Sequence, residues 1–242
     1  TEEEEALGEA AKLMTLMNIF QEDEEYEKCA IIKQRMDIVN KTLKKGKKVM
    51  RKKPMLAYPV SDKPIDYDNR VFMQPKLDGV RCTIQYERRV QPREDVVVAY
   101  SRTGKEWKNI DHILQALVPF FTKHPNVVLD GELYNHDFRD DFESIISMVR
   151  KTKPTDEDRS ISKKHVQFHC YDMVNKGVFH LRDEWLKSNL PESYCVITVP
   201  TVQMTSEAGA RLTHAVNLKA GYEGSIVRLD TPYQCKRSHS LR

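Results

Sequence analysis

A lysine, an aspartate and an arginine stand within six residues of one another in the segment Lys76-Leu77-Asp78-Gly79-Val80-Arg81. A lysine amine is normally protonated, with a pKa of about 10.4, and it acts as a nucleophile only where burial or neighbouring cations keep it partly neutral. Mostly apolar residues at 71–75 precede it. Asp-Gly favours a tight turn, and an arginine can hold a phosphate through two hydrogen bonds. The pattern predicts a nucleophile beside a phosphate clamp, or else a surface turn between two strands.

Four further motifs follow this segment in order along the chain. They are Ser101-Arg102-Thr103-Gly104, Asp130-Gly131-Glu132, the stretch FHCYDMV at 168–174 and the stretch GYEGSIVR at 221–228. Together with the Lys-x-Asp-Gly-x-Arg segment, they resemble the ordered motifs of the covalent nucleotidyltransferases. This superfamily contains ATP-dependent and NAD-dependent DNA ligases, RNA ligases and mRNA capping enzymes. One motif alone is a weak signal, whereas five in order are a strong one, and the resemblance covers roughly residues 54–242.

The resemblance implies nucleotidyl transfer, and an ATP-dependent DNA ligase fits it best. Lys76 would attack the α-phosphate of ATP and keep AMP as a phosphoramidate. AMP would then pass to the 5′-phosphate at a nick in duplex DNA, and a 3′-hydroxyl would displace it. Charge develops on phosphate oxygens at every step, so such a site needs cations more than acid–base pairs. Arg81 and Arg102 are suited to the nucleotide and the nick phosphate.

The resemblance also implies how the nucleotide is held. Glu132 would accept hydrogen bonds from the ribose hydroxyls, although it could be an exposed acid at a strand end. Tyr171 would stack on the adenine, a contact worth roughly 1–3 kcal/mol, although it could be a half-buried strand residue. Gln74 would read the adenine edge through its amide. Glu223, together with Glu132, would bind Mg²⁺, which prefers one or two carboxylates plus phosphate oxygens.

The last ten residues match only the first part of one further motif of the superfamily, the sixth along this chain. Arg237 carries over as a nucleotide contact. The sequence stops where the lysines of that motif are expected. We therefore expect a catalytic domain cut before those lysines and before an oligonucleotide-binding domain.

Three other functions remain open. Glu223-Gly224 followed by Arg228 is more typical of a DNA ligase than of an mRNA capping guanylyltransferase, which usually has Asp-Gly. RNA ligases more often have a less basic nucleophile motif without its arginine, which is Arg81 here. A capping enzyme would take label from GTP and not from ATP. A nucleic-acid-binding module with an inactive nucleotidyltransferase fold is the non-enzyme alternative, and the presence of Lys76, Glu132 and Glu223 argues against it.

Composition favours a soluble intracellular protein and leaves its compartment open: the cytoplasm, the nucleus, or the host cytoplasm if the source is viral. No apolar run reaches the ~18 residues of a membrane helix, and the acidic N-terminus is unlike a signal peptide. The five cysteines are odd in number and lack CxxC spacing, which predicts free thiols and no structural zinc. We expect a monomer without a membrane partner.

Charge is distributed unevenly along the N-terminal part. The first 25 residues carry nine acids and one lysine, whereas residues 41–53 carry eight lysines and arginines and no acid. A basic run of this kind can neutralise DNA phosphates. We therefore predict a contact with DNA through Lys44, Lys45, Lys47 and Lys48. The alternative is a solvated helix end followed by a linker.

The helical spacing of the N-terminal residues and the extent of the resemblance together predict two domains, 1–53 and 54–242. Residues 1–50 have helical spacing and should form two helices, the second ending near Gly46, either packed on the catalytic domain or forming a separate module.

The rest mixes strands and helices without βαβ alternation, which predicts an α+β fold. The resemblance implies an ATP-grasp-like nucleotidyltransferase domain with antiparallel sheets flanked by helices. We expect strands at 71–73, 80–86, 96–100, 127–129, 166–172, 196–202 and 225–229, helices at 110–121, 142–150, 181–190 and 206–220, charged turns at 87–89 and 93–95, and a charged loop at 151–164.

Overall fold

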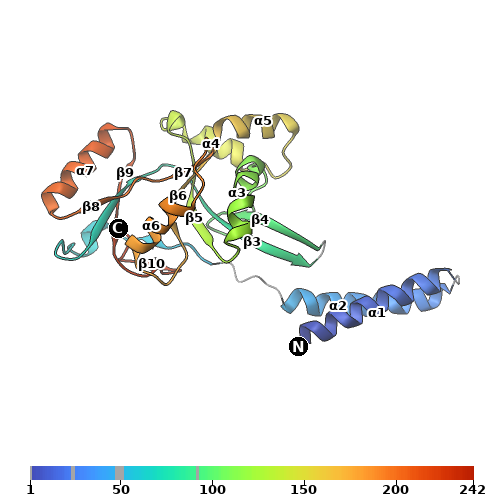
Figure 1. The fold of residues 1–242 in the computed structure, drawn as a ribbon. Helices are drawn as coiled ribbons and strands as arrows, with labels where there is room; N and C mark the ends of the chain where they lie inside the picture. Colours follow the sequence, from blue (N-terminus) through green and yellow to red (C-terminus); the bar gives the residue numbers. More distant parts are fainter. Residues whose placement is uncertain (1, 23–24, 47–51, 91–92) are drawn as a thin grey trace. The chain divides into compact units, whose positions relative to one another are not determined.

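The computed structural model describes residues 2–22, 25–46, 52–90 and 93–242 (Figure 1). The chain divides into two compact units, Thr1–Arg51 and Lys52–Arg242. Within the described residues, no helix is long and apolar enough to cross a membrane. All five cysteines are free thiols, as predicted.

The first unit is a pair of antiparallel helices, as predicted. Helix α1 spans Glu2–Glu22 and α2 spans Tyr26–Gly46. The Nε of Arg35 donates a hydrogen bond of 2.6 Å to Oε1 of Glu9, which joins the two helices. Ile32 and Val39 are buried between the helices; they lie seven positions, or about two helical turns, apart and so share one face. Lys44 and Lys45 belong to the end of α2, while Lys47 and Lys48 lie outside the described residues.

The second unit contains three sheets. In the five-stranded sheet, with order β4-β3-β5-β6-β7, only the β6–β7 pair is parallel. Its strands are β3 (Val80–Val90), β4 (Arg93–Tyr100), β5 (Val128–Tyr134), β6 (Gln167–Met173) and β7 (Val196–Thr198). The antiparallel three-stranded sheet, with order β8-β2-β9, contains β2 (Val71–Lys76), β8 (Val202–Met204) and β9 (Gly224–Leu229). A short parallel pair joins β1 (Leu56–Ala57) to β10 (Arg237–Ser238).

Helices flank these sheets, so the predicted α+β class is confirmed. They are α3 (Asp111–Lys123), α4 (Phe142–Val149), α5 (Asp156–His165), α6 (Phe179–Asn189) and α7 (Glu207–Lys219), with short 3₁₀ turns η1 (Val60–Asp62) and η2 (His136–Phe138). The apolar face of α3, with Ile113 and Leu117, packs in the main core with strand residues such as Leu129 and Phe168. A smaller core joins Ala210 of α7 to the three-stranded sheet.

Three local predictions were wrong. The segment 151–164 is not a loop throughout, because Thr155 and Asp158 form a reciprocal capping box that begins α5. The predicted strand 196–202 is two strands in different sheets, since Pro200 lies between β7 and β8. The charged stretches 87–89 and 93–95 are not turns: the β3–β4 ladder continues to the pair Val90 and Arg93.

Candidate functional site

The pairing of β2 with β9 brings Lys76 and Glu223 together. Lys76 ends β2 opposite Gly224, and the backbone N–H of Glu223 donates to the carbonyl of Lys76 at 3.1 Å. The Nζ of Lys76 forms an ion pair with Oε1 of Glu223, and both side chains keep more than a third of their surface exposed. The amine is therefore held by a carboxylate at a point that a substrate can reach.

A small cavity of about 170 Å³ lies beside this ion pair. Five residues that the sequence predicts for the site line it: Gln74, Lys76, Arg81, Glu132 and Tyr171. They come from β2, β3, β5 and β6, which belong to two different sheets. The cavity is thus formed where the two sheets meet.

Glu132 is the acid that lines the cavity in the described part of the chain. It is partly buried, and its Oε2 is closed off from solvent with no hydrogen-bond partner among the described residues. Burial raises the pKa of Glu132 to about 7; Arg81 opposes this shift, and Asp130 adds to it. A Cβ on Gly79 would lie only 2.9 Å from Oε2, so the turn after Lys76 needs glycine here. An unpartnered carboxylate oxygen suits a ligand that brings hydroxyl groups or a cation.

The guanidinium of Arg81 donates hydrogen bonds to other groups of the protein. Its Nε and Nη2 donate to the two oxygens of Asp130, at 2.7 and 2.5 Å, and Nη2 also donates to the carbonyl of Met55 at 2.9 Å. The hydroxyl of Tyr233 donates to Asp130 Oδ2 at 2.6 Å. The guanidinium edge predicted to clamp a phosphate is therefore occupied by a carboxylate.

Gln74 and Tyr171 belong to a second buried network. The amide nitrogen of Gln74 donates to the Tyr171 carbonyl at 3.2 Å and to Thr201 Oγ1 at 2.9 Å, and its oxygen accepts from Arg228 Nε. The guanidinium carbon of Arg228 lies 5.1 Å from the centre of the Tyr171 ring. The Gln74 amide predicted to read adenine is thus bound to protein groups on both its nitrogen and its oxygen.

Arg228 depends in turn on Asp172, which is fully buried. Arg228 Nη1 donates to Asp172 Oδ2 at 2.8 Å, and Arg182 donates to both oxygens of Asp172, at 2.7 and 3.0 Å. One buried carboxylate therefore pairs with two buried guanidinium groups, and removing it would leave both without a charged partner in the interior. The sequence offered no signal for Arg182, since it stands outside every motif.

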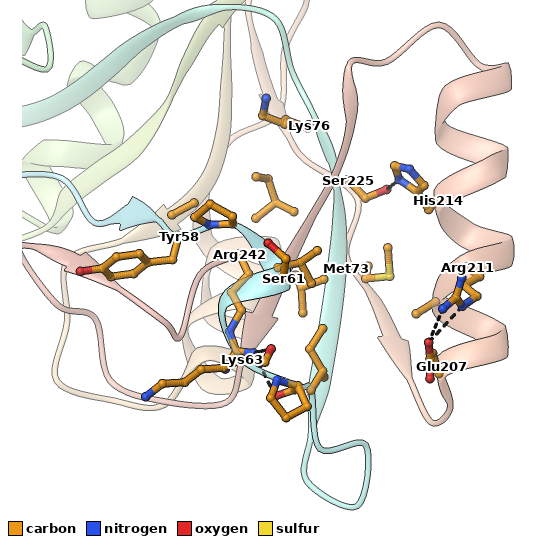
Figure 2. Close-up of a pocket in the computed structure, with 18 of the residues that line it drawn as sticks. Tyr58, Ser61, Lys63, Met73, Lys76, Glu207, Arg211, His214, Ser225 and Arg242 are labelled. Carbon is orange, nitrogen blue, oxygen red and sulfur yellow. Dashed lines mark hydrogen bonds and ion pairs between the residues drawn. The ribbon is translucent and has the colours of Figure 1, made fainter.

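The two remaining predicted arginines line larger grooves. Arg102 lines a groove of about 710 Å³ that shares Arg81 and Glu132 with the small cavity. Arg237 lines a third groove of about 840 Å³, where it donates to the Ala57 carbonyl and lies 5.5 Å from the Tyr58 ring centre. Figure 2 shows this third groove, with Lys76 at one end and the Arg211–Glu207 pair at the other. The structure brings Arg237 to the Lys76 side of the unit but not into the small cavity.

The carboxylates could serve a hard cation. In the described part of the chain, no group of three or more His, Cys, Asp or Glu side chains forms a metal cluster. Glu223 lies near enough to Glu132 to raise its pKa further. Because Mg²⁺ is commonly held by one or two carboxylates together with phosphate oxygens and water, Glu132 and Glu223 fit a metal that arrives with a nucleotide.

The order and spacing of these residues can be compared with known proteins. The family model described as ATP dependent DNA ligase domain matches residues 54–241. The chain belongs to this family. No curated protein sequence matches the chain.

Solved structures of ligases share the fold of this family member. The structure named Pmar-Lig_PreS3 matches with a TM-score of 0.60 and 20% identity, over 86% of this chain and 49% of that one. The DNA ligase of bacteriophage T7 in complex with ATP matches at 0.59 and 16%, over 79% and 68%. The Chlorella virus DNA ligase-adenylate matches at 0.54 and 20%, over 77% and 63%. The chain thus spans about half the length of the first relative.

Proposed function

We propose that this ligase-family chain seals nicks in duplex DNA at the expense of ATP, through a covalent lysyl-AMP intermediate. The observation that carries the proposal is the position of Lys76: its amine lies at the rim of a cavity lined by Glu132 and Tyr171, within reach of Glu223. The family membership supports an ATP-dependent ligase, and the geometry supplies the lysine, ring and acids that such chemistry uses.

In the proposed first step, Lys76 attacks as a free amine. The N–P bond to the α-phosphorus forms while the bond to the bridging oxygen breaks, so pyrophosphate leaves and AMP stays on Nζ. The amine must first lose a proton and its ion pair with Glu223. In the later steps AMP passes to the 5′-phosphate of the nick, and the 3′-hydroxyl then displaces it.

The surrounding residues have proposed roles that follow their placement. Glu132 Oε2, which has no partner in the described structure, accepts from the ribose hydroxyls. Tyr171 presents its ring to the adenine, and the buried Gln74 fixes the backbone that carries the ring. Arg81, whose guanidinium is paired with Asp130, lines the shared wall of the cavity and the Arg102 groove. Arg102 is proposed to meet the nick phosphate, and Arg237 the outer part of the nucleotide.

Glu223 and Glu132 are the proposed ligands of Mg²⁺. When bound, the ion would offset negative charge on the phosphate oxygens, which is its common contribution to such transfers. Glu223 would have to exchange its contact with Lys76 for the metal, and this exchange would leave the amine without its carboxylate partner.

The proposed partner is nicked double-stranded DNA, bound by a monomer. We propose that residues 54–242 form the nucleotidyltransferase domain and that residues 1–53 add a DNA contact through the basic run. That run carries eight cations over residues 41–53. Their attraction to phosphates is independent of sequence and falls with salt.

Labelling with α-³²P nucleotides tests the central step. The purified chain should take covalent label from ATP, and intact mass should rise by one AMP. Lys76→Ala should abolish the label, while Lys187→Ala, which removes an exposed lysine paired with Asp183, should retain it. Label in the Lys76→Ala protein would refute the assignment of the nucleophile. Label from GTP in place of ATP would favour a capping guanylyltransferase.

A further inference from the structure

A histidine outside every motif joins the five-stranded sheet to the turn that leads into β9. His136 begins η2, four residues after Glu132 of β5. Its Nδ1 lies 2.7 Å from the hydroxyl of Tyr134, and its Nε2 lies 3.0 Å from the carbonyl oxygen of Ala220. Ala220 is the C-cap of α7 and stands three residues before Glu223. The imidazole therefore connects the strand that carries one acid of the proposed metal pair to the turn that carries the other.

The two contacts determine which ring nitrogen of His136 carries the hydrogen. A carbonyl oxygen can only accept, so Nε2 donates to Ala220. Nδ1 of the neutral ring then accepts from the hydroxyl of Tyr134. Burial raises the pKa of Tyr134 to about 12, so this hydroxyl keeps the hydrogen that it donates. Both nitrogens are thus bonded, and the ring is held in one tautomer and one orientation.

Further contacts join η2 to the same turn. The rings of His136 and Tyr222 pack against each other, with centroids 4.5 Å apart. Gly221 has a φ of 89°, in the left-handed region that favours glycine. A Cβ on Gly221 would lie only 2.7 Å from Cδ of Arg139, so the absence of a side chain lets Arg139 cover the turn. Three successive residues of the turn, 220–222, are therefore in contact with the segment that follows β5.

Both ends of this connection are anchored in the fold. Asn135 is only 8% exposed; its oxygen accepts from the N–H of Asp137 at 3.0 Å, and its amide donates to the carbonyl of His165 at 2.8 Å. These bonds tie η2 to the end of α5. On the other element, the N–H of Glu223 donates to the carbonyl of Lys76 at 3.1 Å. A movement of η2 relative to β2 would therefore be transmitted to the turn that presents Glu223.

We propose that the bond from His136 to the Ala220 carbonyl positions Glu223, and so sets the separation of the two acids that share the metal ion. This proposal rests on the proposed ligase function, in which Glu132 and Glu223 hold Mg²⁺ together with the nucleotide. Mg²⁺ demands near-ideal octahedral geometry, so two carboxylates on separate elements bind it well only at a fixed separation. His136 is a positioning residue, because it acts through the turn and contacts neither acid directly.

Two substitutions of His136 separate the two bonds of its ring. In His136→Gln the side-chain amide reaches the place of Nε2 and can still donate to Ala220, whereas the shorter amide of His136→Asn reaches only the place of Nδ1. Binding of Mn²⁺, which takes the same oxygen ligands as Mg²⁺, is measured by electron paramagnetic resonance. The whole chain is saturated with an ATP analogue that has a methylene between the α- and β-phosphorus, so that no transfer occurs. His136→Asn should raise the Kd for Mn²⁺ about tenfold, and His136→Gln should stay within about twofold of the parent.

His112→Asn is the matched control. The Nε2 of His112 lies 2.9 Å from the carbonyl oxygen of Val166, so this variant removes a bond of the same kind at a partly buried position. His112 lines neither the small cavity nor the two larger grooves. The control should lower the melting temperature about as much as His136→Asn does, and it should leave Mn²⁺ binding unchanged. Equal losses of Mn²⁺ affinity in the two asparagine variants would reflect a general loss of stability, and the proposal would be wrong.

The tautomer of His136 gives a readout that needs neither metal nor nucleotide. Nitrogen-15 NMR of the imidazole rings in the parent chain should place the hydrogen of His136 on Nε2. A hydrogen on Nδ1 would remove the donor to Ala220 and overturn the proposal.

The outcomes also separate this proposal from the function on which it rests. A parent chain that takes label from ATP, while His136→Asn binds Mn²⁺ as tightly as the parent, would overturn the positioning role and leave the ligase function standing. A loss of Mn²⁺ affinity in His136→Gln as large as that in His136→Asn would overturn it too, because glutamine keeps the donor to Ala220. Absent labelling of the parent by ATP would reject the ligase function itself.

Discussion

Replacing Glu132 by glutamine should stabilise the protein in a way that depends on pH. Removal from water raises the pKa of Glu132 from 4.5 to about 7, because the cavity disfavours the charged carboxylate. A difference of one pKa unit corresponds to about 1.36 kcal/mol. The rise of the pKa from 4.5 to about 7 therefore means that ionised Glu132 lowers the free energy of unfolding by about 3 kcal/mol at most.

The sign follows from which state binds the proton more tightly. Below about pH 4.5 Glu132 is protonated in both the folded and the unfolded chain and costs nothing. As pH rises, the unfolded chain ionises first, so the free energy of unfolding falls until the folded carboxyl has also titrated, near pH 7. Glutamine cannot ionise and keeps nearly the same shape, so the Glu132→Gln variant should lack this loss.

Urea unfolding of the parent and of Glu132→Gln at several values between about pH 5 and pH 8 measures the effect. The advantage of the variant should grow with pH, from under 1 kcal/mol at the acid end to about 2–3 kcal/mol at the alkaline end. In a domain of this size, that corresponds to a rise of roughly 4–12 °C in melting temperature. An advantage that is constant with pH, or that grows toward acid, would refute the reasoning. Covalent labelling by ATP should fall in the same variant, because a group that lowers the stability of the protein at a functional site is usually retained for its function.

Four other changes have definite expected outcomes. Lys76→Arg should lose covalent labelling by ATP as completely as Lys76→Ala, because a guanidinium stays protonated; a labelled arginine variant would contradict the covalent role. Glu223→Gln should slow labelling far more than it weakens ATP binding and should alter the Mg²⁺ dependence, and a normal Mg²⁺ titration would exclude a metal ligand. Tyr233→Phe should lower the free energy of unfolding by about 1–3 kcal/mol in urea titrations, since Asp130 and the Met55 N–H lose their shared hydroxyl; an unchanged midpoint would show that water replaces it. Joint neutralisation of the basic run, at Lys44, Lys45, Lys47 and Lys48, should flatten the salt dependence of nicked-DNA affinity with little effect on labelling. Equal salt slopes for the parent and the variant would mean that the run is only a linker.

Local patterns predicted most of the elements but not how side chains are shared between them. Strand β2, helix α3 and the hairpin of the first unit follow from apolar spacing, which is a property of neighbouring residues. The signal for α5 was present as Thr155 and Asp158, a capping box whose meaning is easily missed in a highly charged segment. Pro200 gave a comparable signal for the break between β7 and β8.

The predicted site residues Arg81 and Gln74 show why the rest could not be read from the sequence. Both have polar groups that fit a nucleotide, and both are bound instead to protein groups far along the chain. Arg81 pairs with Asp130, 49 positions away, and Gln74 accepts from Arg228, 154 positions away. Hydrogen-bond partners at such separations depend on the register of three sheets. A motif therefore identifies the residues that gather around a site, while the fold decides which of them remain available to a substrate.

The short pairing of β1 with β10 bears on when the site can be completed during synthesis. Arg237 reaches the Ala57 carbonyl across 180 positions, and Tyr233 meets the Met55 N–H across 178. Contacts that close such long loops form late, and a chain emerging from the ribosome makes its N-terminal part first. A nascent chain would thus already contain Lys76, Glu132 and Tyr171 before Tyr233, whose hydroxyl donates to Asp130, has been translated. The buried arrangement around Arg81 would then be completed only after Tyr233 has left the ribosome.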